Sequence, residues 1–94
     1  MNIGVLTLEL YLPISVSLKD KRKVLQSLQR RLRNHHNLAI AEVGHQELWQ
    51  RASLAIVSVA SRRDMLERLF DSVLSETERS IPGEIVGAER EFFN

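Results

Sequence analysis

The chain has 94 residues, of which 44% are hydrophobic and 27% charged, and its formal net charge is +1. These values are typical of one small globular domain and exclude a disordered, fibrous or two-domain protein, so we expect a single domain over residues 1–94. The absence of cysteine excludes disulfide bonds and thiolate metal sites.

Residues 3–12 form the first apolar run, and its alternation with a period of two predicts a β-strand. One face of that strand is wholly apolar and consists of Leu6, Leu8, Leu10 and Leu12. The run has no basic leader, and it is shorter than the roughly 20 apolar residues that a membrane span needs. We therefore expect a cytoplasmic protein without membrane association.

A helix is predicted to follow Pro13, because Ser17 and Asp20 form a Ser-x-x-Asp capping pattern. Its apolar side consists of Leu18, Leu25, Leu28 and Leu32. The polar sequence 34–37 is expected to end the helix. Within it His35 and His36 are adjacent, so we expect their side chains to diverge and hold no metal.

The same helix is unusually basic, since residues 17–33 contain seven Lys and Arg against one acidic residue, Asp20. With a total charge of +1, the rest of the chain is net acidic. At about 100° per residue, five basic side chains form one solvent-facing stripe. This basic stripe consists of Lys19, Arg22, Lys23, Arg30 and Arg33. The stripe predicts binding of phosphate groups or nucleic acid. An equally strong alternative is that these side chains only keep an exposed helix face solvated.

Residues 38–43 are predicted to form a short second strand, and the 42–51 loop that follows is rich in functional groups. It contains Glu42, Gly44, His45, Glu47, Trp49 and Arg51. Two carboxylates and an imidazole are compatible with acid–base catalysis or a hard-metal site. However, no nucleophile is paired with the imidazole and the loop has no second histidine, so we expect a conformational and structural role.

This structural interpretation assigns a task to several loop residues. Gly44 is expected to permit a turn, and Trp49 is expected to close the open end of the core. Arg51 is expected to pair with Glu47 or Glu42. We therefore predict no catalytic residue, no metal and no cofactor in this protein.

The second half of the chain repeats the order of the first. Residues 52–60 are nearly all apolar, which is typical of a strand buried on both sides. Ser61 and Asp64 repeat the capping pattern before a second helix, and residues 84–93 are predicted to form an edge strand. The inward side of that helix is expected to contain Leu66, Leu69, Phe70 and Val73.

The element order predicts an α+β fold, namely a ferredoxin-like βαββαβ sandwich. We expect a four-stranded antiparallel sheet with two helices on one face. The first and third strands are expected in its centre and in the same direction, because they are the most uniformly apolar.

The other face of the sheet would then be open, with a small apolar centre and a charged rim. Its residues are expected to include Val5, Thr7, Glu9, Tyr11, Ala55, Val57, Glu89 and Glu91. Such an uncovered patch favours a homodimer through this face. RNA binding on the sheet is not expected, because the face is acidic and has few aromatic side chains on which bases could stack.

The segments 17–23 and 41–52 resemble hallmark motifs of the YlxP-like family, a set of small bacterial proteins of unknown function. The resemblance covers nearly the whole chain, and it implies a ferredoxin-like fold and a bacterial cytoplasmic origin. Genes of this family often lie beside those of transcription and translation factors, which suggests a link to RNA or ribosome maturation. The resemblance supplies no catalytic residue.

We therefore expect a non-enzymatic binding protein that contacts structured RNA or a ribosomal particle through the basic stripe. One alternative is a small anionic-ligand-binding or enzymatic domain that uses the 42–51 loop. Another is a protein-interaction adaptor that uses the open sheet face.

Overall fold

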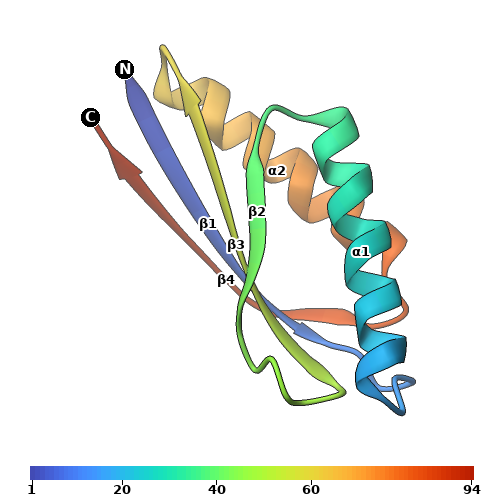
Figure 1. Cartoon of the computed structure of the whole chain (residues 1–94). Helices are drawn as coiled ribbons and strands as arrows, with labels where there is room; N and C mark the ends of the chain where they lie inside the picture. The colour runs from blue at the N-terminus through green and yellow to red at the C-terminus, as the bar shows by residue number, and fades with distance from the viewer.

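A computed structural model describes all 94 residues and contains six elements in the predicted order. They are β1 (Asn2–Tyr11), α1 (Leu18–His35), β2 (Ala39–Gly44), β3 (Arg51–Ala60), α2 (Arg63–Ser80) and β4 (Glu84–Phe93) (Figure 1). The strands form one antiparallel sheet in the order β2-β3-β1-β4. The ferredoxin-like α+β fold is thus confirmed.

The relative direction of the two central strands differs from the prediction. β1 and β3 are central as expected, but they pair antiparallel, with Leu8 opposite Leu54. Each helix runs back along the sheet, so that the strand after it points in the same direction as the strand before it. β2 therefore runs parallel to β1. The β2–β3 hairpin then reverses the chain, which makes β3 antiparallel to β1.

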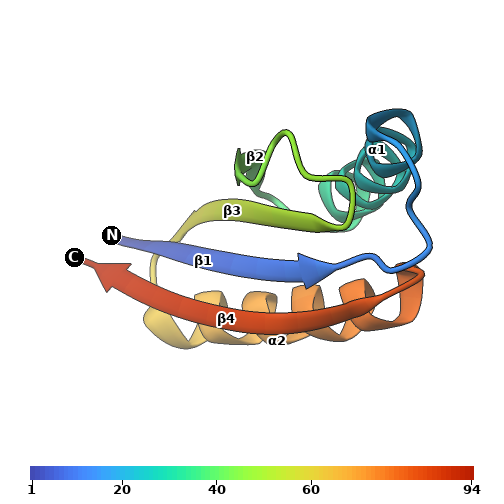
Figure 2. The same ribbon diagram turned by 90° about the horizontal axis from the view of Figure 1, so that it is seen from below.

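Both helices pack on one face of the sheet, and the core lies between these two layers (Figure 1). α2 contacts β1, β3 and β4, whereas α1 contacts β2 and α2. Figure 2 shows the four strands side by side, with α1 near β2. The buried apolar core includes Leu6, Leu8, Leu10, Leu12, Leu25, Leu28, Leu32, Leu54, Ile56, Phe70 and Val73.

β3 is buried on one side only, contrary to the expectation from its composition. Leu54 and Ile56 face the helices and are buried, whereas Val59 on the open face is 51% exposed. Small and β-branched residues gave β3 the composition of a doubly covered strand. The fold has only two helices, however, and both of them lie on the same side.

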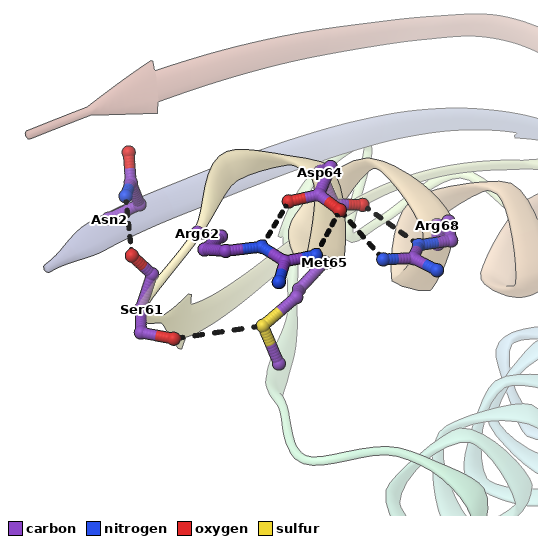
Figure 3. Close-up of polar contacts among 6 residues, drawn as sticks. All are labelled: Asn2, Ser61, Arg62, Asp64, Met65 and Arg68. Carbon is purple, nitrogen blue, oxygen red and sulfur yellow. Dashed lines mark hydrogen bonds and ion pairs between the residues drawn. The ribbon is translucent and has the colours of Figure 1, made fainter.

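The two helices begin differently. Ser17 caps α1 as predicted, since its hydroxyl accepts a hydrogen bond from the backbone N–H of Asp20. Ser61 does not cap α2, because Arg62 is the N-cap residue and the hydroxyl of Ser61 contacts the sulfur of Met65 (Figure 3). Asp64 instead accepts hydrogen bonds from the guanidinium groups of Arg62 and Arg68. These bonds hold the pKa of Asp64 well below its ordinary value.

The turn after α2 depends on a close backbone approach. A Cβ atom at Gly83 would lie 2.1 Å from the carbonyl oxygen of Tyr11, so no larger residue fits at this position. Gly83 thereby lets β4 start directly beside the end of β1, where Tyr11 pairs with Glu84.

Candidate functional site

The basic stripe of α1 is solvent-exposed along its whole length, as predicted. None of its five side chains forms an ion pair, whereas three exposed arginines at the start of α2 do, namely Arg62, Arg63 and Arg68. Asp20, the one acidic residue nearby, accepts a hydrogen bond from the backbone N–H of Val16 instead. The positive charge of the stripe is therefore not neutralised within the protein.

Lys21 is the exception among the lysines of this segment, because it is 1% exposed. Its ammonium lies 2.8 Å from a carboxylate oxygen of Glu42 on β2. It also donates hydrogen bonds to three backbone carbonyls, those of His45 at 2.8 Å, Gln46 at 3.2 Å and Arg51 at 3.3 Å. One side chain of α1 thus holds both ends of the β2–β3 loop.

The sequence contained a signal for this anchor that our interpretation missed. Lys21 falls at helical spacing between Leu18 and Leu25, on the side that faces the core. A lysine in that position is rarely buried unless it is paired. Its pairing with Glu42 also occupies one of the carboxylates that an acid–base mechanism in the 42–51 loop would use.

Trp49 does not close the core, and the prediction that it does is wrong. Its side chain is 53% exposed, and Leu48 is also half exposed. The buried core includes Leu12, directly after β1, and Ile81, directly after α2, but neither Leu48 nor Trp49. The loop is held in place by polar contacts, because Gln50 accepts a backbone hydrogen bond from Leu12 and its side chain donates one to the carbonyl of Pro13.

The turn in this loop is made by His45 and not by Gly44. His45 has a φ of 56°, in the left-handed region, whereas no glycine in the chain has a positive φ. Gly44 fits closely here for another reason, since a Cβ atom there would lie 3.1 Å from the hydroxyl oxygen of Ser53, which would have to move by a few tenths of an ångström. The absence of a side chain lets β2 approach β3 closely.

The predicted ion pair of Arg51 is also wrong, because its side chain has no acidic partner within the loop. Glu42 is paired with Lys21, and Glu47 is exposed without a partner. On the open face, Glu9 accepts a hydrogen bond from Ser53 and lies 3.7 Å from the imidazole of His45. In a nucleophilic triad the imidazole would lie between the other two groups, whereas here the carboxylate does.

His35 and His36 converge, although adjacent residues were expected to diverge. Both imidazoles contact the carboxylate of Glu76 on α2, and the distance from His36 Nε2 is 2.9 Å. His35 is the last residue of α1 and His36 caps it in an extended conformation, which turns the second ring back towards α2. The pair therefore connects the end of α1 to α2.

The environment of Glu76 changes its acidity. Its side chain is 10% exposed, and this burial alone would raise the pKa. The hydrogen bonds and the electrostatic interactions with His36 and His35 oppose the effect of burial and hold the pKa of Glu76 below its ordinary value. No group of three or more His, Asp or Glu residues is arranged to hold a metal ion.

Two further observations concern the helices and the relatives of the protein. Neither helix combines the length and the apolar character that a membrane crossing would require. The family model described as "Protein of unknown function (DUF503)" matches residues 3–90. The uncharacterized protein YlxP of Bacillus subtilis (strain 168) is 41% identical over 71 residues, which cover 69% of this chain and 77% of that protein.

Solved structures resemble the chain in fold. The structural-genomics protein YJCS matches with a TM-score of 0.57 and 9% sequence identity, over 98% of this chain and 99% of that chain. Protein Atu4242 from Agrobacterium tumefaciens matches with a TM-score of 0.47 and 15% identity, over 100% and 92% of the two chains. At these identities the likeness to YJCS supports the fold alone.

Proposed function

We propose that this chain, which belongs to the DUF503 family of proteins of unknown function, is a non-enzymatic RNA-binding protein. Its partner is a structured RNA or a ribosomal particle, and the basic stripe of α1 contacts the phosphate backbone. The observation that carries the proposal is that all five side chains of the stripe are exposed and unpaired.

Surface lysines and arginines usually have acidic neighbours at helical spacing, which reduce their attraction for other anions. α2 follows this rule, because Arg68 pairs with Asp64 and Arg63 with Glu67. α1 does not follow it, although the chain as a whole is almost neutral. A continuous positive helix face is suited to contact successive phosphates, and arginine can bind each of them through two parallel hydrogen bonds.

The open sheet face is a poor surface for RNA. It carries Glu9, Glu89 and Glu91, and its strands present few aromatic side chains on which bases could stack. RNA would therefore contact the helix side of the molecule. Contacts to phosphate and not to base edges predict broad sequence tolerance and strong dependence on salt.

We propose further that the open face forms a homodimer. The register places Val5 beside both Val57 and Glu91, so apolar residues in the centre adjoin carboxylates on β4. Val59 and Phe93 lie on the same face and are about half exposed, at 51% and 49%. Burying this patch against a second copy would remove apolar surface from water, while the acidic residues at its edge stay solvated.

The deciding experiment is a pull-down of the tagged protein from a bacterial lysate, with and without nuclease treatment. We expect RNA to be recovered with the protein and to disappear on raising the salt concentration. Recovery of protein partners that are unaffected by nuclease, with no RNA, would instead favour an adaptor. A saturable thermal shift with one phosphorylated metabolite, and none with RNA, would favour a small-ligand domain.

A further inference from the structure

The largest cleft of the molecule lies between α1 and α2, and the 42–51 loop contributes no residue to it. It has a volume of about 690 Å³ and is lined by nine residues, none of them hydrophobic. Arg31 and His35 of α1 and the cap residue His36 form one wall, and residues between 71 and 80 of α2 form the other. A wholly polar lining of this kind is not suited to an apolar ligand.

The charges in the cleft are distributed unevenly. Each of its two carboxylates is already held by a cation or imidazole of the protein, since Asp71 pairs with Arg90 and Glu76 binds both histidines. Arg31 and Arg79 also line the cleft, one from each helix, and neither forms an ion pair or a side-chain hydrogen bond. The cleft therefore contains two guanidinium groups, one on each wall, that have no partner within the protein.

Hydroxyl groups complete this arrangement. Ser72 and Ser75 of α2 line the cleft, and neither side chain is engaged in a hydrogen bond within the protein. Two guanidinium groups can each bind a phosphate through two parallel hydrogen bonds, and hydroxyls can donate to the remaining oxygens. The donors present match the acceptors of a phosphate group, which carries negative charge and several oxygens.

We propose that this cleft is a second anion site, which binds a phosphate group between Arg31 and Arg79. It is distinct from the basic stripe, because Arg31 lies about 130° around α1 from the middle of the stripe. The inference does not rest on RNA binding by the stripe. The phosphate is that of a free phosphorylated compound or of an RNA backbone that continues past the stripe, and the experiment separates these two sources.

The test compares the parent with the double variant Arg31→Gln/Arg79→Gln. The matched control is Arg51→Gln/Arg68→Gln, which removes the same charge from two exposed arginines outside both the cleft and the basic stripe. Each protein is titrated with pyrophosphate and, separately, with a single-stranded RNA oligonucleotide at low salt. Binding is followed by backbone amide NMR, which also shows whether each variant is folded.

For a free ligand, we expect saturable pyrophosphate binding with amide shifts confined to residues 31–36 and 71–80. The double variant should bind about tenfold more weakly, whereas the control binds like the parent. For an RNA phosphate, pyrophosphate should bind little, but the double variant should lose more RNA affinity than the control. The proposal is overturned if neither probe distinguishes the double variant from the control. Pyrophosphate binding in the cleft does not require the basic stripe. The pyrophosphate titration therefore tests the cleft even if the stripe does not bind RNA.

Discussion

The ammonium of Lys21 and the carboxylate of Glu42 lie 2.8 Å apart and join α1 to β2. Because Lys21 is buried and also bonded to three carbonyls of the hairpin loop, its loss leaves several acceptors and a carboxylate without a partner. We predict that Lys21→Met lowers the free energy of unfolding by about 3 kcal/mol, as for other broken buried pairs. Chemical denaturation measures this change.

Glu42→Gln should destabilise the protein less, by about 2 kcal/mol, because the three carbonyls still solvate the ammonium. The matched control is Lys19→Met, an exposed lysine two residues away, which should change stability by no more than about 0.5 kcal/mol. Equal stability of the Lys21 and Lys19 variants would show that the buried ion pair contributes nothing.

Trp49 lies at the surface of the loop that Lys21 holds. Truncation should therefore cost little, and we predict that Trp49→Ala changes the free energy of unfolding by about 1 kcal/mol or less. Phe70→Ala, which empties a fully buried position, should cost about 3–5 kcal/mol. Thermal unfolding compares the two. A Trp49 variant that unfolds as early as the Phe70 variant would restore the core role expected from sequence.

The element order, the positions of both helices and the apolar face of β1 were predictable, because alternation in Leu6–Leu12 and helical spacing in Leu25–Leu32 are local signals. The partners of individual polar side chains could not be predicted in this way. Lys21 was counted with its basic neighbours, although only the position of the hairpin, fixed by long-range pairing, provides the oxygens that stabilise a buried ammonium.

The same reason explains the errors at Trp49 and His36. A large indole in a polar loop suggests burial, yet polar contacts of Gln50 fix the loop and leave the indole outside. The imidazoles of His35 and His36 meet on Glu76, which is about 40 residues away in the chain. Sequence spacing within one segment contains no information about such a partner.

The basic stripe should determine how RNA affinity depends on salt. We predict that replacing Lys19, Lys23, Arg30 and Arg33 by glutamate abolishes RNA retention, while stability changes by about 0.5 kcal/mol per site because these side chains are solvated. In parallel glutamine variants, the slope of log affinity against log salt should fall by about 0.7–0.9 for each phosphate that the protein no longer neutralises.

The measurement is a filter-binding titration at several salt concentrations, with Arg51→Gln as the control for removal of a charge outside the stripe. If the quadruple glutamate variant binds RNA with the parent affinity and slope, the stripe serves solubility alone.

Glu76 should make the free energy of unfolding depend on pH in the acidic range. Its pKa in the folded protein lies below the ordinary value of 4.5, so the folded state favours the carboxylate. This contribution is fully present above about pH 4.5 and is lost as the pH falls through the lower folded value. We predict that Glu76→Gln destabilises the protein by about 2 kcal/mol at neutral pH, and that its difference from the parent shrinks in acid.

Unfolding in denaturant from pH 7 down to pH 3 tests this dependence. Glu78→Gln is the matched control, because Glu78 is an exposed carboxylate on the same helix without an ion pair. A difference between the Glu76 variant and the parent that is independent of pH would show that only the shape of the side chain matters.

The open sheet face should control association. We predict that Val57→Asp converts a dimer into a monomer, because it introduces a charge beside Val5 in the centre of the apolar patch. Sedimentation of parent and variant at high micromolar concentration measures this change. Met65→Asp on α2, another exposed apolar residue, should leave association unchanged. A parent protein that sediments as a monomer would rule out the dimer.

The burial of Lys21 also makes its amine less accessible to reagents than the amines of the other two lysines. The chain has only three lysines, Lys19, Lys21 and Lys23, and the middle one is enclosed by oxygens of the hairpin. An acetylating enzyme or an amine-selective reagent that meets the folded protein would therefore modify two side chains and spare the one between them. Acetylation would then remove charge from the basic stripe without loosening the loop, and labelling of Lys21 would report unfolding.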